Sequence, residues 1–421
     1  MATVSTGIAE LCQQAKEASR ELAVTSTVRK NAALHAVAAA LERRIPEILE
    51  ANALDLDAAR VNGLKSALLD RLALDADRVE AMAVGVREVA ALPDPVGEVV
   101  DGWRLPNGLD IARRRSPLGV IAIVYEARPN VTIDAGALCL KSGNAAVLRG
   151  STMAEHSNAV LGAVFAEAVQ AEGLPPGTIC PLAGRDRDDL RELATQEGVV
   201  DLILPRGGEG LKQVLKQHAT VPVIYAASGN CHVYVDAEAD EAKARAVTLN
   251  AKTQRPGVCN AAETLLVHAT LAETMLPVLL ADLHEAGVEI SGDDRARAAG
   301  RPTPVAAATD EDWSAEFHAL KIVVGVVDSA QEAIDHVNRY GTGHSEAIVT
   351  ESGPTARAFT DAVDAACVYV NASTRFTDGF EFGMGAEIGN STQKLHARGP
   401  IGLRELTSVR YVVHGDGQVR E

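Results

Sequence analysis

The stretch Gly119–Tyr125 (GVIAIVY) decides the fold, because it is an unbroken apolar run at the start of a regularly alternating region. Such a run is typical of a strand buried on both faces of a parallel sheet. Downstream, four more strand-like segments alternate with four helix-like ones. The expected strands are 144–148, 178–182, 199–204 and 221–226, and the expected helices are 131–140, 155–172, 188–197 and 211–218. This alternation predicts an α/β fold with a doubly wound parallel sheet.

The regions on either side complete the expected layout. Residues 11–92 have apolar positions every three or four residues, which predicts helices, and Pro93-Asp94-Pro95 breaks that pattern. A second α/β set follows the first sheet and predicts a second domain of comparable size. Its expected strands are 231–235, 263–267, 322–327, 347–350 and 367–370, and its expected helices are 271–286, 330–340 and 354–363.

A hairpin is expected between the helical region and the first sheet. Residues 102–115 alternate around the turn signal Pro106-Asn107-Gly108, and the return arm 109–115 is basic. Two interpretations remain open for this hairpin: an edge that pairs with another subunit, or a plain surface hairpin.

Composition excludes several classes of protein. The 421 residues carry a net charge of -17, which argues against a nucleic-acid partner, because neutralising phosphates needs clustered Lys and Arg. No apolar run approaches the ~20 residues that span a bilayer, and the N-terminal residues lack the apolar core of a signal peptide. The six cysteines form no CxxC pair. We therefore expect reduced thiols, a cytoplasmic location and no metal site.

Two strand ends are candidate nucleotide contacts, although the chain has no G-x-G-x-x-G motif of the required context. Arg149 directly follows one expected strand, and Arg206-Gly207-Gly208 follows another and leads into a helix. An arginine can hold a phosphate with two hydrogen bonds, and glycines at a helix N-terminus let a pyrophosphate approach the backbone. Because parallel sheets bind ligands beyond the carboxyl ends of their strands, these turns together favour a dinucleotide site.

Cys259 is the candidate nucleophile. It lies on a turn-rich segment before an apolar strand, and Lys252 and Arg255 are near enough in sequence to lower the pKa of its thiol. The alternative is a small buried apolar side chain, which is the usual fate of a cysteine. Cys139, Cys180 and Cys367 lie within helix or strand patterns and are expected in the core. Cys231 and His232 are adjacent in a strand, so their side chains should point to opposite faces and form no dyad.

At this point the chain resembles a known family, the gamma-glutamyl phosphate reductases (glutamate-5-semialdehyde dehydrogenases) of the aldehyde dehydrogenase superfamily. The resemblance covers nearly the whole chain, and its motifs are long. They are 117–130 (PLGVIAIVYEARPN), 141–149 (KSGNAAVLR), 204–208 (LPRGG), 229–236 (GNCHVYVD), 250–260 (NAKTQRPGVCN), 370–379 (VNASTRFTDG) and 385–400 (GAEIGNSTQKLHARGP).

The resemblance implies that NADPH reduces L-glutamyl 5-phosphate to L-glutamate 5-semialdehyde and phosphate, the second step of proline biosynthesis from glutamate. It implies an aldehyde dehydrogenase-like fold with a Rossmann-type cofactor domain, an α/β catalytic domain and a small β oligomerisation element. We expect 1–103 and 117–232 to form the NADP-binding domain, 233–390 the catalytic domain, and 104–116 with 391–421 the oligomerisation part. A homo-oligomer and a functional pairing with glutamate 5-kinase are also implied.

The resemblance further assigns roles to individual residues. Cys259, Asn130 and Asn260 are expected to be catalytic. Lys141, Arg149, Arg206, Gly207, Gly208 and Glu316 are expected to bind the cofactor, and Arg255, Arg375 and Asp378 the substrate. For Arg375 and Asp378 a structural ion pair within the loop is an equal alternative.

One departure from hydrolytic relatives bears on mechanism. Those enzymes carry a glutamate that activates water, whereas the matching stretch 226–230 (AASGN) has no carboxylate. Three other functions share some of these features: a CoA-acylating aldehyde dehydrogenase, a thiol acyltransferase or hydrolase without redox chemistry, and a catalytically silent oligomerising protein.

Overall fold

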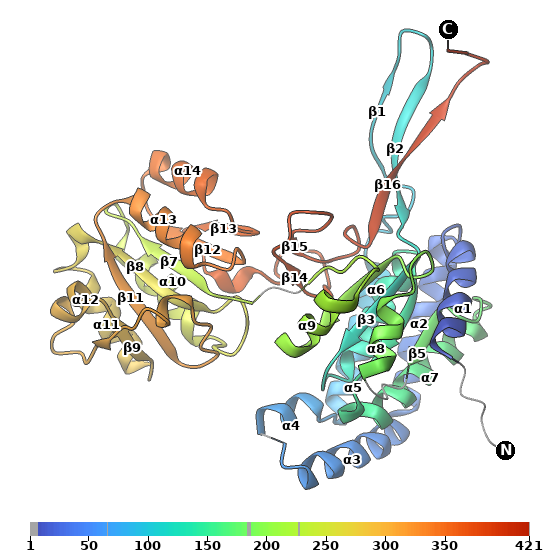
Figure 1. Cartoon of the computed structure of the whole chain (residues 1–421), viewed down its shortest axis with the longest axis horizontal. Helices are drawn as coiled ribbons and strands as arrows, with labels where there is room; N and C mark the ends of the chain where they lie inside the picture. The colour runs from blue at the N-terminus through green and yellow to red at the C-terminus, as the bar shows by residue number, and fades with distance from the viewer. Residues whose placement is uncertain (1–6, 65, 183–186, 226–227, 421) are drawn as a thin grey trace. The chain divides into compact units, whose positions relative to one another are not determined.

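The chain divides into two units (Figure 1). The computed structural model describes residues 7–64, 66–182, 187–225 and 228–420. The first unit comprises 1–225, 383–389 and 401–421, and the second comprises 226–382 and 390–400. The border expected after residue 232 falls inside strand β7 (Cys231–Val235), which lies entirely in the second unit. The expected C-terminal segment 391–421 is shared between the two units.

The first unit opens with helices, as the sequence predicts. They are α1 (Ile8–Leu22), α2 (Thr27–Arg43), α3 (Ile45–Val61), α4 (Ser66–Leu72) and α5 (Ala76–Ala91). Two of these helices begin at a side-chain cap: Ser26 accepts a hydrogen bond from the Arg29 N–H, and Asp75 accepts one from the Arg78 N–H. Such caps satisfy N–H groups that have no partner within the helix, and each contributes about 1 kcal/mol.

A parallel sheet forms the centre of the first unit. Its strands are β3 (Val120–Tyr125), β4 (Ala145–Arg149), β5 (Ile179–Leu182) and β6 (Leu202–Arg206), in the order β5-β4-β3-β6. Every residue of β3 is buried, which confirms the reading of its apolar run. The strand order reverses between β3 and β6, so the carboxyl ends of these two strands mark the switch point of the sheet.

The expected fifth strand, 221–226, is wrong within the part that the structure describes. Only Val223 bridges to Ile203, and Ala226 lies outside the described residues. Pro222 gives a physical reason, since it has no N–H to donate to a ladder.

Helices connect the strands at nearly the expected positions. They are α6 (Asn130–Lys141), α7 (Glu155–Ala171), α8 (Arg187–Ala194) and α9 (Glu209–His218), with a short 3-10 turn η1 (Thr152–Ala154) before α7. Gly143 and Gly173 follow α6 and α7 with φ of 77° and 76°. This left-handed conformation is easiest for glycine and ends each helix where the sequence predicts.

The predicted hairpin is present and gains a third strand. β1 (Val99–Arg104) pairs antiparallel with β2 (Asp110–Pro117), and β2 pairs antiparallel with β16 (Thr407–His414) from the C-terminal segment. Figure 1 shows the three strands side by side, extending beyond the helices of the same unit. The sheet order β1-β2-β16 leaves β1 and β16 as open edges.

The second unit is built on a parallel sheet of seven strands in the order β10-β9-β11-β8-β7-β12-β13. In addition to β7, its strands are β8 (Ala262–His268), β9 (Glu289–Gly292), β10 (Ala306–Ala307), β11 (Lys321–Val327), β12 (Ser345–Val349) and β13 (Cys367–Val370). Alternate side chains enter different cores: Val233 and Val235 pack in one cluster, and Tyr234 between them packs in another. Both faces of the sheet are therefore covered, as in a doubly wound fold.

The helices of this unit are α10 (Glu241–Thr253), α11 (Leu276–Glu285), α12 (Asp294–Ala299), α13 (Ala330–Tyr340) and α14 (Gly353–Ala362). Three 3-10 turns, η2 (Ala269–Leu271), η3 (Asp312–Ser314) and η4 (Thr374–Phe376), and a short pair of strands, β14 (Asn390–Ser391) and β15 (Gly399–Pro400), complete it. The bounds of β7, β13 and α13 coincide with the predicted ones. Helices α10 and α12 and strands β9 and β10 were not predicted. Within the described residues, no helix is long and apolar enough to cross a membrane.

Candidate active site

Cys259 lies in the second unit, on the loop between α10 and β8. It is partly exposed, whereas the other five cysteines are buried. This difference removes the reading of Cys259 as an ordinary core residue and confirms the core positions expected for Cys139, Cys180 and Cys367.

Two neighbours fix the backbone of the Cys259 loop. A Cβ on Gly229 would overlap the carbonyl group of Cys259, so only glycine fits there. The Cys231 thiol donates to the same carbonyl oxygen at 3.2 Å. Burial raises the pKa of that thiol well above its ordinary value, so Cys231 serves as a neutral donor. Gly229 and Cys231, at the amino end of β7, thus fix the backbone of the Cys259 loop.

The predicted separation of Cys231 from His232 is confirmed. His232 is fully buried and its Nδ1 lies 3.0 Å from Glu346 Oε2, which also accepts the His232 backbone N–H at 2.7 Å. The two neighbouring side chains therefore have different partners.

Asn260 is tied to the loop that follows β13. Its Nδ2 donates to the carbonyl oxygens of Thr377 at 2.9 Å and Arg375 at 3.3 Å, and its Oδ1 accepts from the Arg375 guanidinium. The Thr374 hydroxyl donates to the Asn260 carbonyl at 2.7 Å. Because the amide is engaged at both ends, its side chain is not free to turn toward a substrate oxygen. Asn260 positions its neighbours in this structure, and its expected catalytic role stays a prediction.

The three expected substrate-binding residues gather near Cys259. Burial is the main cause that lowers the pKa of the Arg375 guanidinium, and the positive charge of Arg255 lowers it further. Asp378 and Cys259 act in the opposite direction and raise this pKa. Arg375 Nε also donates to Gln254 Oε1 at 2.8 Å. Arg255, Asp378 and Cys259 therefore all act electrostatically on Arg375, and the segment 374–378 carries both Arg375 and Asp378.

Glu316 approaches the same loop from another direction. Its carboxylate lies 3.4 Å from His318 Nε2, and it accepts the Gly229 backbone N–H. Burial alone would raise the pKa of Glu316, but the bonds from His318 and Gly229 outweigh it and hold the pKa below its ordinary value. Glu316 is thus an ionised acceptor next to the glycine that supports Cys259.

Lys252 has a different position from the one expected. Its ammonium is fully buried and donates to Glu263 Oε2 at 2.6 Å, in an ion pair whose two side chains have no exposed area. Burial raises the pKa of Glu263 to about 7. The idea that Lys252 activates Cys259 directly is therefore corrected: its charge is committed to Glu263.

Sequence reasoning missed His344, which lies at the amino end of β12. His344 is fully buried, its Nδ1 lies 2.7 Å from Ser345 Oγ, and its Nε2 has no hydrogen-bond partner among the described residues. Burial lowers its pKa to about 4, and Glu316 partly offsets this. A polar tetrad, Thr342-Gly343-His344-Ser345, directly before an apolar strand was the available signal.

The nucleotide candidates lie in the first unit, at the carboxyl ends of its strands. Arg149 ends β4 and Arg206 ends β6, and both strands pair with β3 between them. The Gly208 N–H, at the start of α9, donates to Glu126 Oε2 at 3.0 Å. The sheet thus brings Arg149, Arg206, Gly207 and Gly208 to one edge, as expected. A carboxylate already bonded to the helix N-terminus indicates that this edge accepts an anion, which fits a dinucleotide diphosphate.

Asn130 begins α6 at that same edge. Its Nδ2 donates to Asp134 Oδ2 at 2.8 Å. Burial raises the pKa of Asp134 to about 6, while Asn130 and Arg206 partly offset it. Asn130 therefore belongs to the first unit, and Cys259 to the second.

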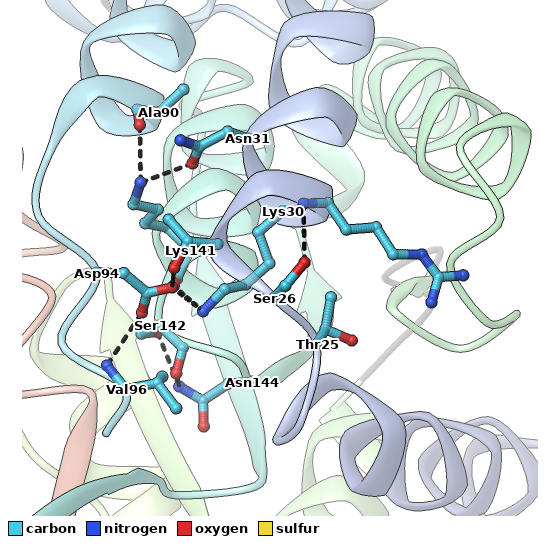
Figure 2. A network of polar contacts seen from close by, with 12 residues as sticks. Thr25, Ser26, Lys30, Asn31, Ala90, Asp94, Val96, Lys141, Ser142 and Asn144 are labelled. Atoms are coloured by element: carbon cyan, nitrogen blue, oxygen red, sulfur yellow. Dashed lines mark hydrogen bonds and ion pairs between the residues drawn. The ribbon is translucent and has the colours of Figure 1, made fainter. Parts of the chain in front are cut away.

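Lys141 does not lie at this edge, and its expected cofactor role is corrected. It is fully buried in the last turn of α6, and its ammonium donates to Asn31 Oδ1 and to the Ala90 carbonyl oxygen, both at 2.7 Å (Figure 2). Because α6 runs back from the carboxyl end of β3, its own C-terminus lies at the opposite edge of the sheet. Lys141 instead joins α6 to α2 and α5.

Comparisons with known proteins agree with this geometry. The model of the aldehyde dehydrogenase family matches residues 2–297. A gamma-glutamyl phosphate reductase of Moorella thermoacetica is 55% identical over 409 residues, which is 97% of each chain, and one of Kineococcus radiotolerans is 54% identical over 420 residues, 99% of this chain and 97% of that one. This chain belongs to the gamma-glutamyl phosphate reductase family.

Solved structures extend the comparison. The gamma-glutamyl phosphate reductase of Thermotoga maritima matches with a TM-score of 0.96 and 46% identity, over 99% of this chain and 100% of that one. An acetylating aldehyde dehydrogenase of Geobacillus thermoglucosidasius matches with a TM-score of 0.69 and 18% identity, over 98% and 97% of the two chains. At this low identity, the second comparison shows only that the two proteins share the aldehyde dehydrogenase fold. The expected fold class is confirmed.

Proposed function

We propose that this chain reduces L-glutamyl 5-phosphate to L-glutamate 5-semialdehyde and phosphate, with NADPH as the reductant and a thioester on Cys259 as the intermediate. This is the second step of proline biosynthesis from glutamate. The observation that carries the proposal is the partly exposed Cys259, on a loop held by Gly229 and Cys231 and flanked by the guanidinium groups of Arg255 and Arg375. The family relation supports the substrate, since close relatives bear its name.

The side chains around Cys259 suit acyl transfer. The Cys259 thiolate attacks the acyl carbon, phosphate leaves, and the acyl group is held as a thioester. Backbone N–H groups of the Cys259 loop stabilise the oxyanion. The catalytic role that the resemblance gives Asn130 stays a prediction. When the reduced adduct collapses, the aldehyde leaves and the thiolate is restored. The stretch 226–230 supplies no carboxylate to activate water against the thioester.

NADPH, when bound, supplies the hydride. Arg149, Arg206, Gly207 and Gly208 would hold it in the first unit, because they combine two cationic side chains with a glycine-rich helix start at the switch point of the sheet. Glu316 would bind the nicotinamide ribose. Arg149 suits a 2'-phosphate, which favours NADPH over NADH.

The amino-acid end of the substrate needs a cation for its carboxylate and an acceptor for its ammonium. Arg375 and Asp378 supply these charges beside Cys259, and Arg255 adds a second cation. An ion pair that only stabilises the loop remains the alternative for Arg375 and Asp378.

The reverse reaction tests the proposal. Purified protein is given glutamate 5-semialdehyde, phosphate and NADP+, and the absorbance of reduced cofactor is followed. Phosphate-dependent formation of NADPH is expected. Formation that requires CoA in place of phosphate would instead identify a CoA-acylating dehydrogenase, and absence of any reduction would contradict redox chemistry.

The sheet of β1, β2 and β16 is the proposed subunit contact of a homo-oligomer. Its surface carries exposed apolar side chains, including Trp103 and Tyr411, whose ring centroids lie 6.4 Å apart, and two open strand edges. Open edges with exposed apolar residues favour pairing with another chain. Pairing with glutamate 5-kinase and a cytoplasmic location stay predictions.

Trp103→Asp tests the subunit contact. A charge in an apolar interface should dissociate the oligomer, as measured by light scattering after size exclusion, while Glu197→Gln, an exposed change elsewhere in the unit, should not. An unchanged mass for Trp103→Asp would exclude this surface as the contact.

A further inference from the structure

A polar pocket in the second unit has no place in the proposed reaction. Its volume is about 250 Å³. It lies between the end of α13, strand β12 and the segment that joins β14 to β15. The residues that shape the argument are Asn338, Thr342, Glu346, Asp364, Lys394 and Arg398. None of these is a residue of the Cys259 loop or one of the proposed substrate contacts.

A buried acid with an unused oxygen forms one wall of the pocket. Glu346 is fully buried, and its contacts with the His232 N–H and Nδ1 both involve its Oε2. Its Oε1 has no hydrogen-bond partner among the described residues. A Cβ on Gly341, which also lines the pocket, would lie 2.9 Å from this oxygen. The unused oxygen therefore lies next to Gly341, within the wall of the pocket.

Burial of an acid without a full set of partners is unfavourable. Burial raises the pKa of Glu346, and the bonds from His232 offset this only in part. A cationic hydrogen-bond donor placed at Oε1 would satisfy the oxygen and stabilise the carboxylate form.

The outer part of the pocket has an excess of positive charge. Lys394 and Arg398 each reach Asp364 at 2.6 Å, on its two separate oxygens. These two cations share one carboxylate, which leaves one unbalanced positive charge. Asp364 is itself held in place, since its backbone N–H donates to Asn338 Oδ1 at 2.9 Å. The two cations are thus presented side by side by a fixed anchor.

We propose that this pocket binds a small free α-amino acid, with the ligand carboxylate on Lys394 and Arg398 and its ammonium on Glu346. Side chains of opposite charge line one small cavity, which suits a zwitterion. Pockets for drug-sized ligands run from about 300 to 1,000 Å³, so the volume of about 250 Å³ suits a smaller molecule. A phosphate alone would leave Oε1 unpaired and bring negative charge toward Glu346.

The pocket is also linked to the nucleophile loop. The Thr342 hydroxyl oxygen accepts the Asn230 N–H at 3.0 Å, and Asn230 follows the glycine on which the Cys259 carbonyl rests. An amino acid that contacts Thr342 should therefore alter the reactivity of Cys259. This second part rests on the proposed nucleophile role of Cys259, whereas binding itself does not.

Calorimetric titration of the full chain with L-alanine and L-proline tests the site. The protein is first alkylated at Cys259 with iodoacetamide, so that binding near the nucleophile is blocked. We expect saturable binding of at least one of the two amino acids. Pyrrolidine, which lacks the carboxylate, and cyclopentanecarboxylate, which lacks the ammonium, should each bind at least tenfold more weakly. Absence of binding by both amino acids, or equal binding of these analogues, would overturn the proposal.

Variants locate the binding. The double change Lys394→Ala with Arg398→Ala should weaken it at least tenfold, and Glu346→Gln should do the same while keeping an oxygen for His232. Lys243→Ala, which breaks the exposed pair with Glu351, is the matched control and should leave binding unchanged. The rim variants alter partly exposed side chains, so they remain informative if Glu346→Gln fails to fold. Unchanged affinity in the rim variant would overturn the assignment, whatever the outcome of the reverse-reaction assay.

Discussion

The two parallel sheets of this protein use opposite edges. In the first unit the candidate ligand contacts follow the strands: Glu126 comes after β3, Arg149 ends β4 and Arg206 ends β6. In the second unit the candidate site residues precede the strands: Cys259 comes before β8 and His344 before β12. The rule that open parallel sheets bind ligands at the carboxyl ends of their strands therefore predicts the proposed cofactor edge and misses the edge of the proposed nucleophile.

The difference has a physical origin. At a carboxyl edge the helix that follows each strand points its N-terminus at the ligand, which suits phosphates. At an amino edge the preceding helix brings the negative end of its dipole, so an anionic nucleophile needs added positive charge. Arg255 and Arg375 supply that charge in the second unit.

Removing the Cys259 thiol should have the largest effect on turnover. It should also distinguish most clearly between the roles proposed for the two sheet edges. Cys259→Ala should lower turnover by about 10³-fold or more, because no covalent intermediate can form. NADPH binding, measured by fluorescence titration, should stay within about twofold of the parent value, since all its expected contacts except Glu316 belong to the first unit. Retained turnover would end the nucleophile assignment, and lost NADPH binding would contradict the separation of the edges.

The support of the nucleophile loop should be the next most sensitive point. Gly229→Ala places a methyl group against the Cys259 carbonyl, so the loop must move. Overpacking of this kind costs about 1–3 kcal/mol of unfolding free energy. We expect a lower melting temperature and slower alkylation of Cys259 by iodoacetamide. Gly353→Ala is the control, because nothing lies within 4 Å of the added Cβ. Equal behaviour of the two variants would show that Gly229 does not set the loop.

The amino edge of the second unit should be sensitive to acid. Burial lowers the pKa of His344 to about 4 from its ordinary 6.5, so the unfolded chain takes up this proton before the folded one does. The contribution of His344 to the unfolding free energy is therefore fully present above about pH 6.5. It decreases as the pH falls toward 4, by up to about 1.4 kcal/mol per pH unit. Denaturant unfolding of the parent and of His344→Gln across this range should show a smaller pH dependence in the variant. Identical slopes would mean that His344 has the same pKa in the folded and the unfolded chain.

The carboxyl edge of the first unit should respond most mildly. Glu126→Gln removes a negative charge from the start of α9 while keeping an oxygen that can accept the Gly208 N–H. Less repulsion of the cofactor phosphates should tighten NADPH binding about fivefold, corresponding to about 1 kcal/mol. Titration at two salt concentrations checks this, with Glu197→Gln as the control. Weaker binding in Glu126→Gln would show that the carboxylate itself contacts the cofactor.

Much of the fold was accessible from the sequence because buried strands are apolar and helices end at glycine. The runs at β3, β7 and β13 and the glycines after α6 and α7 predicted elements close to the observed ones. The strands that the sequence failed to predict, or predicted wrongly, lie at or next to the edges of the sheets. Strand β10 has two residues, and the expected fifth strand of the first sheet holds only one bridge, since Pro222 cannot donate.

The site was predicted less completely, for a related reason. Cys259, Arg375 and Asp378 lie in loops, where polar residues are noticed. His344 and Glu346 lie at or within an apolar strand, and nothing local in the sequence indicates which neighbour satisfies them. The sequence around Lys141 does not show that the C-terminus of α6 lies at the edge of the sheet opposite the carboxyl ends of the strands. Only tertiary structure shows that the Lys141 ammonium meets Asn31 and the Ala90 carbonyl.

Two buried lysines of the first unit, Lys30 and Lys141, have a consequence for cooperativity. Lys30 of α2 bonds the Lys141 carbonyl and pairs with Asp94 after α5, while Lys141 bonds Asn31 and the Ala90 carbonyl (Figure 2). If any one of α2, α5 and α6 moves away from the other two, a buried ammonium or carboxylate loses its partner, which is unfavourable in an apolar interior. We therefore expect these three helices, distant along the chain, to open together in hydrogen exchange.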